Sequence, residues 1–200
     1  LEAHLADLLA ALPHAADPIP IVLALDGVDQ RAGRLRETEA RLRAAGRHPA
    51  VLIALAKALG RQGRWAESAE VAADAATSPD ASTADRVEAA VALAAARSRL
   101  GGPGIPGAEA AELALELARD DPALLAQAHG AMVAATVRAH RPDLGLPHAE
   151  AALRAAERSG QRELVGRATN NLATALNRSG RGSEASVMLE RALVDLEGDL

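Results

Sequence analysis

The chain has 200 residues and a formal net charge of −5, and alanine makes up about a quarter of it. Phenylalanine, tyrosine and cysteine are absent, and Trp65 is the single tryptophan. Strands draw on aromatic and β-branched residues, whereas alanine is the strongest helix former, so this composition predicts an all-α fold. The absence of cysteine excludes disulfides and thiolate chemistry.

Composition also narrows the partners and the compartment. The 22 basic and 27 acidic residues form no long runs of one sign, so the basic stripe that nucleic-acid binding needs is missing. One aromatic side chain leaves almost no platform for stacked bases. No apolar run reaches the roughly 20 residues that span a bilayer. We therefore expect a cytoplasmic domain that binds neither nucleic acid nor membrane.

Helical segments are predicted between breaks at proline and glycine. Prolines such as Pro49, Pro122, Pro142 and Pro147 fall between apolar-periodic segments, where proline starts or stops a helix. The predicted helices span, in chain order, residues 1–12, 19–30, 34–45, 49–62, 65–77, 82–100, 107–119, 122–140, 147–159, 161–179 and 182–197.

Short helices joined by short loops become antiparallel neighbours. We expect one domain over residues 1–200, with a leading helix and linker at 1–18 followed by helix pairs at 19–46, 49–78, 82–119, 122–159 and 161–197. The first residues, Leu1-Glu2-Ala3-His4, carry neither an initiator methionine nor the features of a signal peptide. We therefore expect a fragment of a larger protein.

The last pair shows the repeating frame most clearly. Leu172, Ala173 and Leu176 share one helical face, Gly180 ends the helix, and Ala185 faces back from the next helix. The second pair has the same frame in Leu55, Ala56, Leu59 and Gly63, followed by Trp65 and Ala72. Recurrence every 30 to 45 residues or so indicates a repeat array. The alternative is an antiparallel bundle around one centre, which would not need alanine in the same frame beside a turn glycine.

These quoted segments resemble the tetratricopeptide repeat, over about residues 19 to 197. The resemblance implies a right-handed α-solenoid (superhelix) of about five helix pairs plus the leading helix. It is strongest in the second and fifth pairs. The family's aromatic positions hold leucine, valine or alanine here, except at Trp65, so a groove lined by tyrosine or phenylalanine is not expected. Arrays of this style are common in large bacterial transcriptional and signalling regulators, and the resemblance implies that context.

The resemblance also implies where a partner would bind. In tetratricopeptide arrays the first helix of each pair lines the concave face, and ligand contacts flank its packing leucines and alanines. Carried over by position, the candidate partner-binding residues are Lys57, Arg61, Arg99, Arg138, Arg167, Asn170, Asn171, Asn177 and Arg178. Arginine forks and side-chain amides suit peptide carboxylates and backbones. The alternative is that these are solvated helix faces, with arginines near helix C-termini complementing the helix dipole.

The sequence predicts no catalytic, metal-binding or phosphate-binding site. No two of the six histidines are three or four residues apart on one predicted helix, which a helical metal chelate would need. His148 falls in a predicted turn, and a solvated helical side chain is the favoured interpretation of His129. The glycine-rich stretch 101–107 is followed by Ala108-Glu109, not by the lysine of a phosphate-binding loop, so we expect a connecting loop. Asp121 before Pro122 indicates a helix cap.

Three functional hypotheses follow. The first is a protein- or peptide-interaction module that needs no cofactor or metal. The second is a sensor that binds a small ligand or peptide and relays the change to an output domain. The third, an enzyme, lacks a recognisable nucleophile, base or metal set. A leucine stripe on the first helix (Leu1, Leu5, Leu8, Leu9 and Leu12) either covers the first pair or supports a homodimer.

Overall fold

The computed structural model describes the backbone of residues 2–197 and the side chains of residues 6–29 and 32–190. This part of the chain contains eleven α-helices, a short 3-10 turn and no strand, which confirms the predicted all-α class. The elements are α1 (Glu2–Ala11), η1 (Leu12–His14), α2 (Ile19–Ala32), α3 (Leu35–Ala44), α4 (Pro49–Arg61), α5 (Trp65–Thr77), α6 (Thr83–Leu100), α7 (Ala108–Ala118), α8 (Pro122–Arg138), α9 (Pro142–Ser159), α10 (Arg162–Arg178) and α11 (Gly182–Glu197). No helix in this part of the chain is long and apolar enough to cross a membrane.

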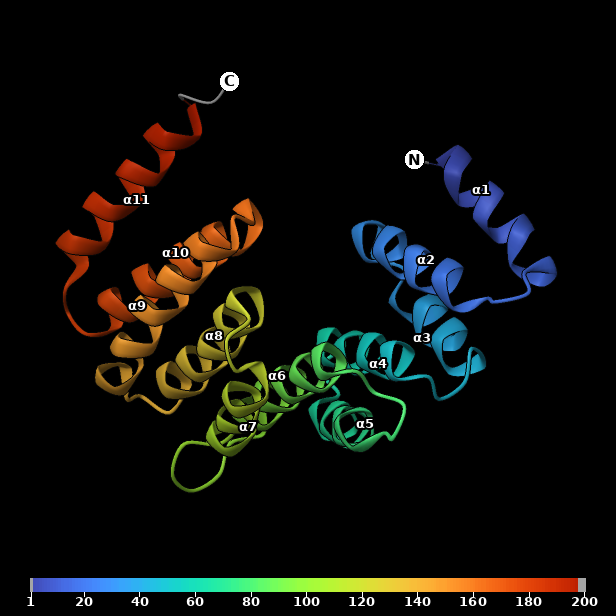
Figure 1. Cartoon of the computed structure of the whole chain (residues 1–200), viewed down its shortest axis with the longest axis horizontal. Helices are drawn as coiled ribbons and strands as arrows, with labels where there is room; N and C mark the ends of the chain where they lie inside the picture. Colours follow the sequence, from blue (N-terminus) through green and yellow to red (C-terminus); the bar gives the residue numbers. More distant parts are fainter. Residues whose placement is uncertain (1, 198–200) are drawn as a thin grey trace.

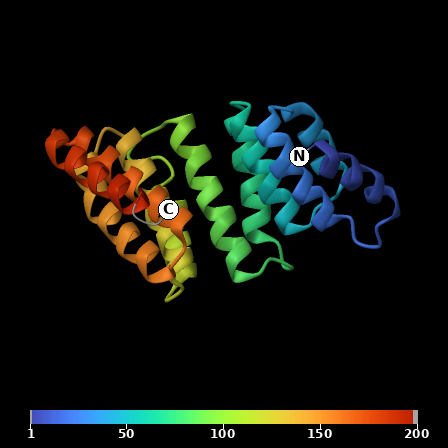
Figure 2. The ribbon, with the colours of Figure 1, turned by 90° about the horizontal axis from the view of Figure 1, so that it is seen from above.

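The helices form an open arc, shown in Figure 1 and from above in Figure 2. Helices α2, α4, α6, α8 and α10 lie on its concave side, and each contacts the next one in this series. The outer helices α5, α7 and α9 pack between the inner helix of their own pair and that of the next pair. The helices therefore make a solenoid, and the alternative of a bundle around one shared centre is wrong.

One type of turn recurs between the two helices of a pair. In four pairs a residue with a positive φ is followed by an arginine whose backbone N–H donates to the carbonyl five residues earlier. This bond satisfies a carbonyl that the end of the first helix leaves free. The donor–acceptor pairs are Arg34–Asp29 at 3.0 Å, Arg64–Leu59 at 3.0 Å, Arg141–Thr136 at 2.8 Å and Arg181–Leu176 at 2.9 Å. The preceding residues are Gly33, Gly63, His140 and Gly180.

The third pair departs from this pattern. Residues 101–107 form the expected connecting loop between α6 and α7. At its end Gly107 has φ +91° and its α-carbon faces the backbone of Ala94, so a β-carbon at this position would collide with the Ala94 carbonyl oxygen. Glycine is therefore required for both the conformation and the close approach.

Small side chains fill the interfaces between helices. Ala56 and Ala72 are fully buried, and Leu55 is 5% exposed. The Ser68 hydroxyl on α5 donates to the Ala56 carbonyl on α4 over 2.7 Å. Leu172 and Ala173, predicted from the same frame in the fifth pair, are also buried. Alanine on both partners lets helix axes approach closely, so the core consists of a chain of local interfaces.

The predicted start of α9 was wrong. The helix begins at Pro142, and Pro147 lies inside it. Pro142 occupies the first helical turn, where its fixed φ suits a helix and its missing N–H costs nothing. Pro147 removes one hydrogen bond, to the Asp143 carbonyl, while the buried Gly145 packs against α8. Packing on α8 therefore outweighs the tendency of proline to end a helix.

The leucine stripe of the leading helix is divided in the structure. Leu12 packs against the core that α2, α3 and α4 share, whereas Leu9 is 42% exposed. The side chains of Leu1 and Leu5 lie outside the described residues. Part of the stripe therefore covers the first pair, and a homodimer remains a prediction.

Candidate partner-binding surface

Two grooves adjoin each other on the concave side. The first groove lies between α4 and α6, has a volume of about 540 Å³, and is lined by Ala56, Lys57, Gly60, Arg61, Trp65, Ser68, Ala92, Ala95, Ala96 and Arg99. The second groove lies over α6, α8 and α10, has a volume of about 520 Å³, and is lined by Ser98, Arg99, Val133, Ala134, Val137, Arg138, His140, Asn171, Thr174 and Arg178. Because Arg99 lines both, the grooves form one continuous surface.

Trp65 forms a wall of the first groove at the start of α5. The guanidinium carbon of Arg99 lies 5.0 Å from the centroid of the Trp65 ring, a cation–π contact. On α4, Gly60 leaves room for the ring, because a β-carbon there would come within 2.9 Å of it. Trp65 is thus held between Gly60 on α4 and Arg99 on α6, and it also lines the groove.

All the charged residues that line the two grooves are basic, and neither lining contains an acidic residue. In the first groove, Lys57 pairs with Glu88, and Arg61 pairs with Asp26 at 3.3 Å. In the second groove, burial lowers the pKa of the Arg138 guanidinium, and the nearby charge of Arg99 lowers it further. Two like charges lie close together there, on a protein that is acidic overall.

The structure brings six of the nine candidate residues into these grooves. Lys57, Arg61 and Arg99 line the first, and Arg99, Arg138, Asn171 and Arg178 line the second. The other three, Arg167, Asn170 and Asn177, are exposed on α10 outside both grooves. Asn171 fits because α8 carries Gly130 opposite it, where a β-carbon would lie only 3.1 Å from the amide nitrogen.

Sequence reasoning did not place several groove residues. Ser98, Thr174 and His140 supply polar groups to the second groove, and Ala95 lines the first. Thr174 lies four residues before Arg178, so helical spacing could have identified it, whereas the adjacent position of Ser98 beside Arg99 does not predict a shared face. His140 could not be found this way, because it lies in a turn where glycine is usual.

A histidine pair between α8 and α9 was also missed. His129 Nδ1 and His148 Nδ1 are 3.0 Å apart, and the ring centroids are 5.2 Å apart. His148 lies within α9, so the prediction that it falls in a turn was wrong. Burial, with the charges of His148 and Arg154, lowers the pKa of His129 to about 4. Burial also lowers the pKa of His148, against an opposing effect of Glu112.

These histidines do not form a metal site with a third ligand. Among the residues that the structure describes, no group of three or more histidine, cysteine or acidic side chains could hold a metal ion. The lowered pKa values of His129 and His148 are consistent with two neutral imidazole rings joined by a hydrogen bond.

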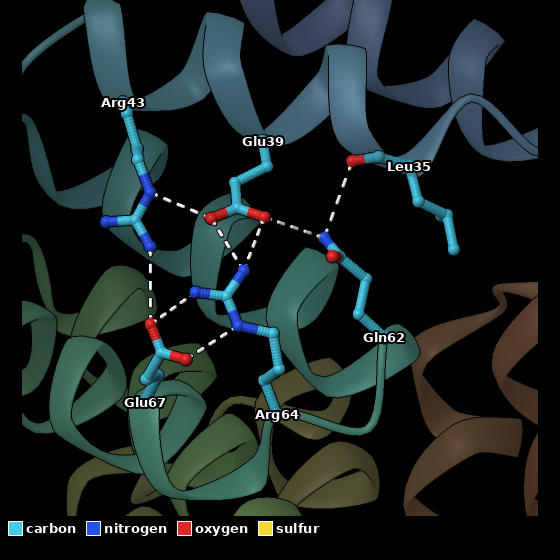
Figure 3. Close-up of polar contacts among 6 residues, drawn as sticks. All are labelled: Leu35, Glu39, Arg43, Gln62, Arg64 and Glu67. Atoms are coloured by element: carbon cyan, nitrogen blue, oxygen red, sulfur yellow. Dashed lines mark hydrogen bonds and ion pairs between the residues drawn. The ribbon is translucent and has the colours of Figure 1, made fainter.

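A polar network joins the first pair to the second, between α3 and the turn from α4 to α5 (Figure 3). Arg64 Nη1 donates to both carboxylate oxygens of Glu39, at 2.8 and 2.7 Å, and Arg64 Nε donates to Glu67 at 2.6 Å. Gln62 and Arg43 also donate to Glu39. Burial raises the pKa of Glu39, but these hydrogen bonds outweigh that effect and lower it overall. The network fixes α3 against the start of α5.

Serial antiparallel helix pairs with an open inner wall define the helical-repeat class of proteins. No protein-family model and no curated protein sequence matches the chain. Among solved structures, the crystal structure of BtubC (BKLC) from P. vanneervenii is similar, with a TM-score of 0.65 and 18% sequence identity. The match covers 94% of this chain and 85% of that chain. The chain therefore has an α-helical repeat fold similar to that of this structure.

Proposed function

We propose that this chain is a protein-interaction module that binds a segment of a partner along its concave face. The observation that carries the proposal is the continuous surface formed by the two grooves, in which Trp65 offers apolar area and Arg99, Arg138 and Arg178 offer charged donors. Such combinations of aromatic and arginine side chains are common at the energetic centre of protein interfaces. Folds of this kind typically carry no catalytic site, and we propose no enzymatic activity.

The test is a selection of binders from a random peptide library, followed by affinity measurements on two variants. Ala95→Trp fills the first groove, whereas Ala66→Trp adds the same bulk to the exposed surface of the outer helix α5. We expect Ala95→Trp to weaken binding by about tenfold or more and Ala66→Trp to leave it unchanged. Equal effects of the two variants, or no selectable peptide, would contradict the proposal.

A second candidate is a sensor that binds a small ligand and relays the change to another part of a larger bacterial regulator. The groove volumes, about 540 and 520 Å³, favour it because small-molecule sites span roughly 300–1,000 Å³. A thermal-shift screen separates the two functions, since a ligand that binds only the folded state raises the melting temperature by mass action. An interaction module would respond to peptides and not to small molecules.

A further inference from the structure

Two histidines meet between the helices of the fourth pair. His129 on α8 and His148 on α9 approach each other with their Nδ1 atoms 3.0 Å apart. Core packing fixes the backbone at both positions, because the neighbouring residues Ala128 and Ala149 are fully buried. Both histidines are only half-buried, so solvent can reach them. The pair therefore offers two nitrogen atoms at one accessible point between an inner and an outer helix.

Neither ring has another protein hydrogen-bond partner. Within the described residues, the hydrogen bond between His129 and His148 is the only one that either ring makes. A structural histidine usually bonds through one nitrogen to a carboxylate or a backbone carbonyl. Here each Nδ1 instead faces a second imidazole, and a neutral imidazole has one bare nitrogen that can bind a metal ion. Imidazole nitrogens are ligands that copper, nickel and zinc ions favour.

The separation of the two nitrogens matches that of neighbouring ligands on one ion. An imidazole nitrogen binds such an ion at about 2.0–2.1 Å. Two ligands at right angles are then about 2.9 Å apart, whereas two tetrahedral ligands are about 3.3 Å apart. The observed 3.0 Å is closer to the first value, which favours the tetragonal geometry of copper(II) and nickel(II).

Ion binding requires two local changes in the rings. In the hydrogen bond, one Nδ1 carries a proton that it donates to the other. That ring must move the proton to its Nε2, and both rings, which are tilted by 50° to each other, must turn until their lone pairs meet at one point. No net proton is lost. Water supplies the remaining ligands, since no third histidine, cysteine or acidic side chain joins the pair within the described residues.

Two exposed charges of opposite sign act on the pair. The charge of Arg154 on α9 acts on His129 and disfavours a cation, whereas that of Glu112 on α7 acts on His148 and favours one. Arg154 also pairs with Glu150 at 3.9 Å, which weakens its effect. The positive charge near the pair is therefore partly balanced, and both side chains can be changed without altering the ligands.

We propose that His129 and His148 bind a divalent copper or nickel ion between them, which links α8 to α9. The inference is independent of the proposed function, because neither histidine lines the grooves on the concave side. The ion joins an inner helix to an outer helix whose second turn contains Pro147. It should therefore stabilise the pair in which a proline has removed a helical hydrogen bond.

The experiment measures nickel binding by isothermal titration calorimetry at pH 7.5, on protein without a histidine tag. The proteins are the wild type, His129→Gln, His148→Gln and the control His14→Gln, which changes an exposed histidine in η1. Magnesium chloride replaces nickel chloride in a parallel titration, because magnesium prefers oxygen ligands. Circular dichroism melting with a chelator shows whether each variant is folded. Electron paramagnetic resonance with copper chloride reports the nitrogen ligands directly.

We expect nickel to bind the wild type at one ion per chain. Each glutamine variant at the pair should weaken binding at least about tenfold, because one ligand alone loses the effective concentration of the second. His14→Gln should change the affinity by less than about twofold. The copper spectrum of the wild type should show two imidazole nitrogens, and that of His129→Gln one fewer. Equally strong magnesium binding, undiminished nickel affinity in either pair variant, or no nickel binding at about 1 mM would overturn the proposal.

Two further variants decide the outcome if a glutamine at the pair prevents folding. Arg154→Gln removes a positive charge and should tighten nickel binding, whereas Glu112→Gln removes a negative charge and should weaken it. Both side chains are exposed, so neither change should disturb helix packing. Equal nickel affinities of these two variants would place the bound ion elsewhere and overturn the inference.

Discussion

At the scale of single residues, Gly145 on α9 faces Thr136 on α8. A β-carbon at Gly145 would lie 2.5 Å from Thr136 Oγ1, and that hydroxyl is already held by the carbonyls of Met132 and Val133. The approach of α9 to α8 at this point therefore depends on the absence of a side chain.

Two glycine substitutions should have opposite effects on stability. Gly145→Ala must push α9 from α8, and we expect it to lower the free energy of unfolding by about 1–3 kcal/mol through overpacking. Gly166→Ala is the matched control, because nothing lies within 4 Å of its added β-carbon on α10. Alanine favours helix over glycine, so this variant should gain about 0.5–1 kcal/mol in urea unfolding. Equal effects would show that α9 does not pack as described.

The histidine pair makes stability depend on pH. The folded-state pKa of His129, about 4, and that of His148 lie below the ordinary value near 6.5, so the unfolded chain binds protons first as pH falls. Their stabilising effect is complete above about pH 6.5 and is lost toward pH 4. Protonation would place positive charge beside Arg154 and between the rings, with Glu112 the opposing charge.

We expect urea unfolding at pH 5 to show a free energy about 1–2 kcal/mol below that at pH 7.5. The double variant His129→Gln/His148→Gln should show a much smaller difference. The exposed His14, His48 and His140 are common to both proteins and serve as the internal control. An unchanged pH dependence in the double variant would exclude the pair as its source.

At the scale of helices, Pro147 is the residue at which local preference and packing disagree. The backbone at position 147 lies in the second turn of α9, where its N–H would bond to the Asp143 carbonyl. Pro147→Ala restores that donor, and we expect a gain of about 1–3 kcal/mol in the free energy of unfolding. Pro142→Ala, in the first turn, should change stability little. A loss of stability from Pro147→Ala would place the start of α9 after the proline.

Local sequence signals were sufficient to predict where most helices begin and end. Apart from the start of α9, predicted and observed boundaries agree to about two residues, because glycine and arginine mark the pair turns and proline or a cap such as Asp121 marks the starts. At the fourth turn His140 adopts φ 59°, so the usual glycine signal is missing. The start of α9 was therefore predicted at Pro147, whereas the helix begins at Pro142.

The candidate surface was predictable only in part. Arg99, Arg138 and Arg178 follow from one helical frame, since each occupies the last turn of an inner helix. The contact between His129 and His148 was not predictable, because it depends on how α8 and α9 are rotated about their axes. The predicted start at residue 147 also left His148 at the very end of the helix, where a turn was expected. Contacts between side chains on different helices could therefore be identified only from the structure.

At the scale of the whole molecule, each helix pair contacts only its neighbours, so the inner wall is built from one helix of every pair. The wall remains open because the outer helices pack on its far side, as seen in Figures 1 and 2. Stability is then a sum over pairs and their interfaces, while the concave surface is free to bind.

Protection of single cysteines by a selected peptide tests this account most directly, because the chain has no cysteine of its own. Ala95→Cys places a thiol in the first groove, and Ala66→Cys places one on the exposed surface of the outer helix α5. With saturating peptide, we predict that thiol labelling slows by at least about tenfold at position 95 and by less than about twofold at position 66. Equal protection at both positions, or protection at position 66 alone, would contradict binding on the concave face.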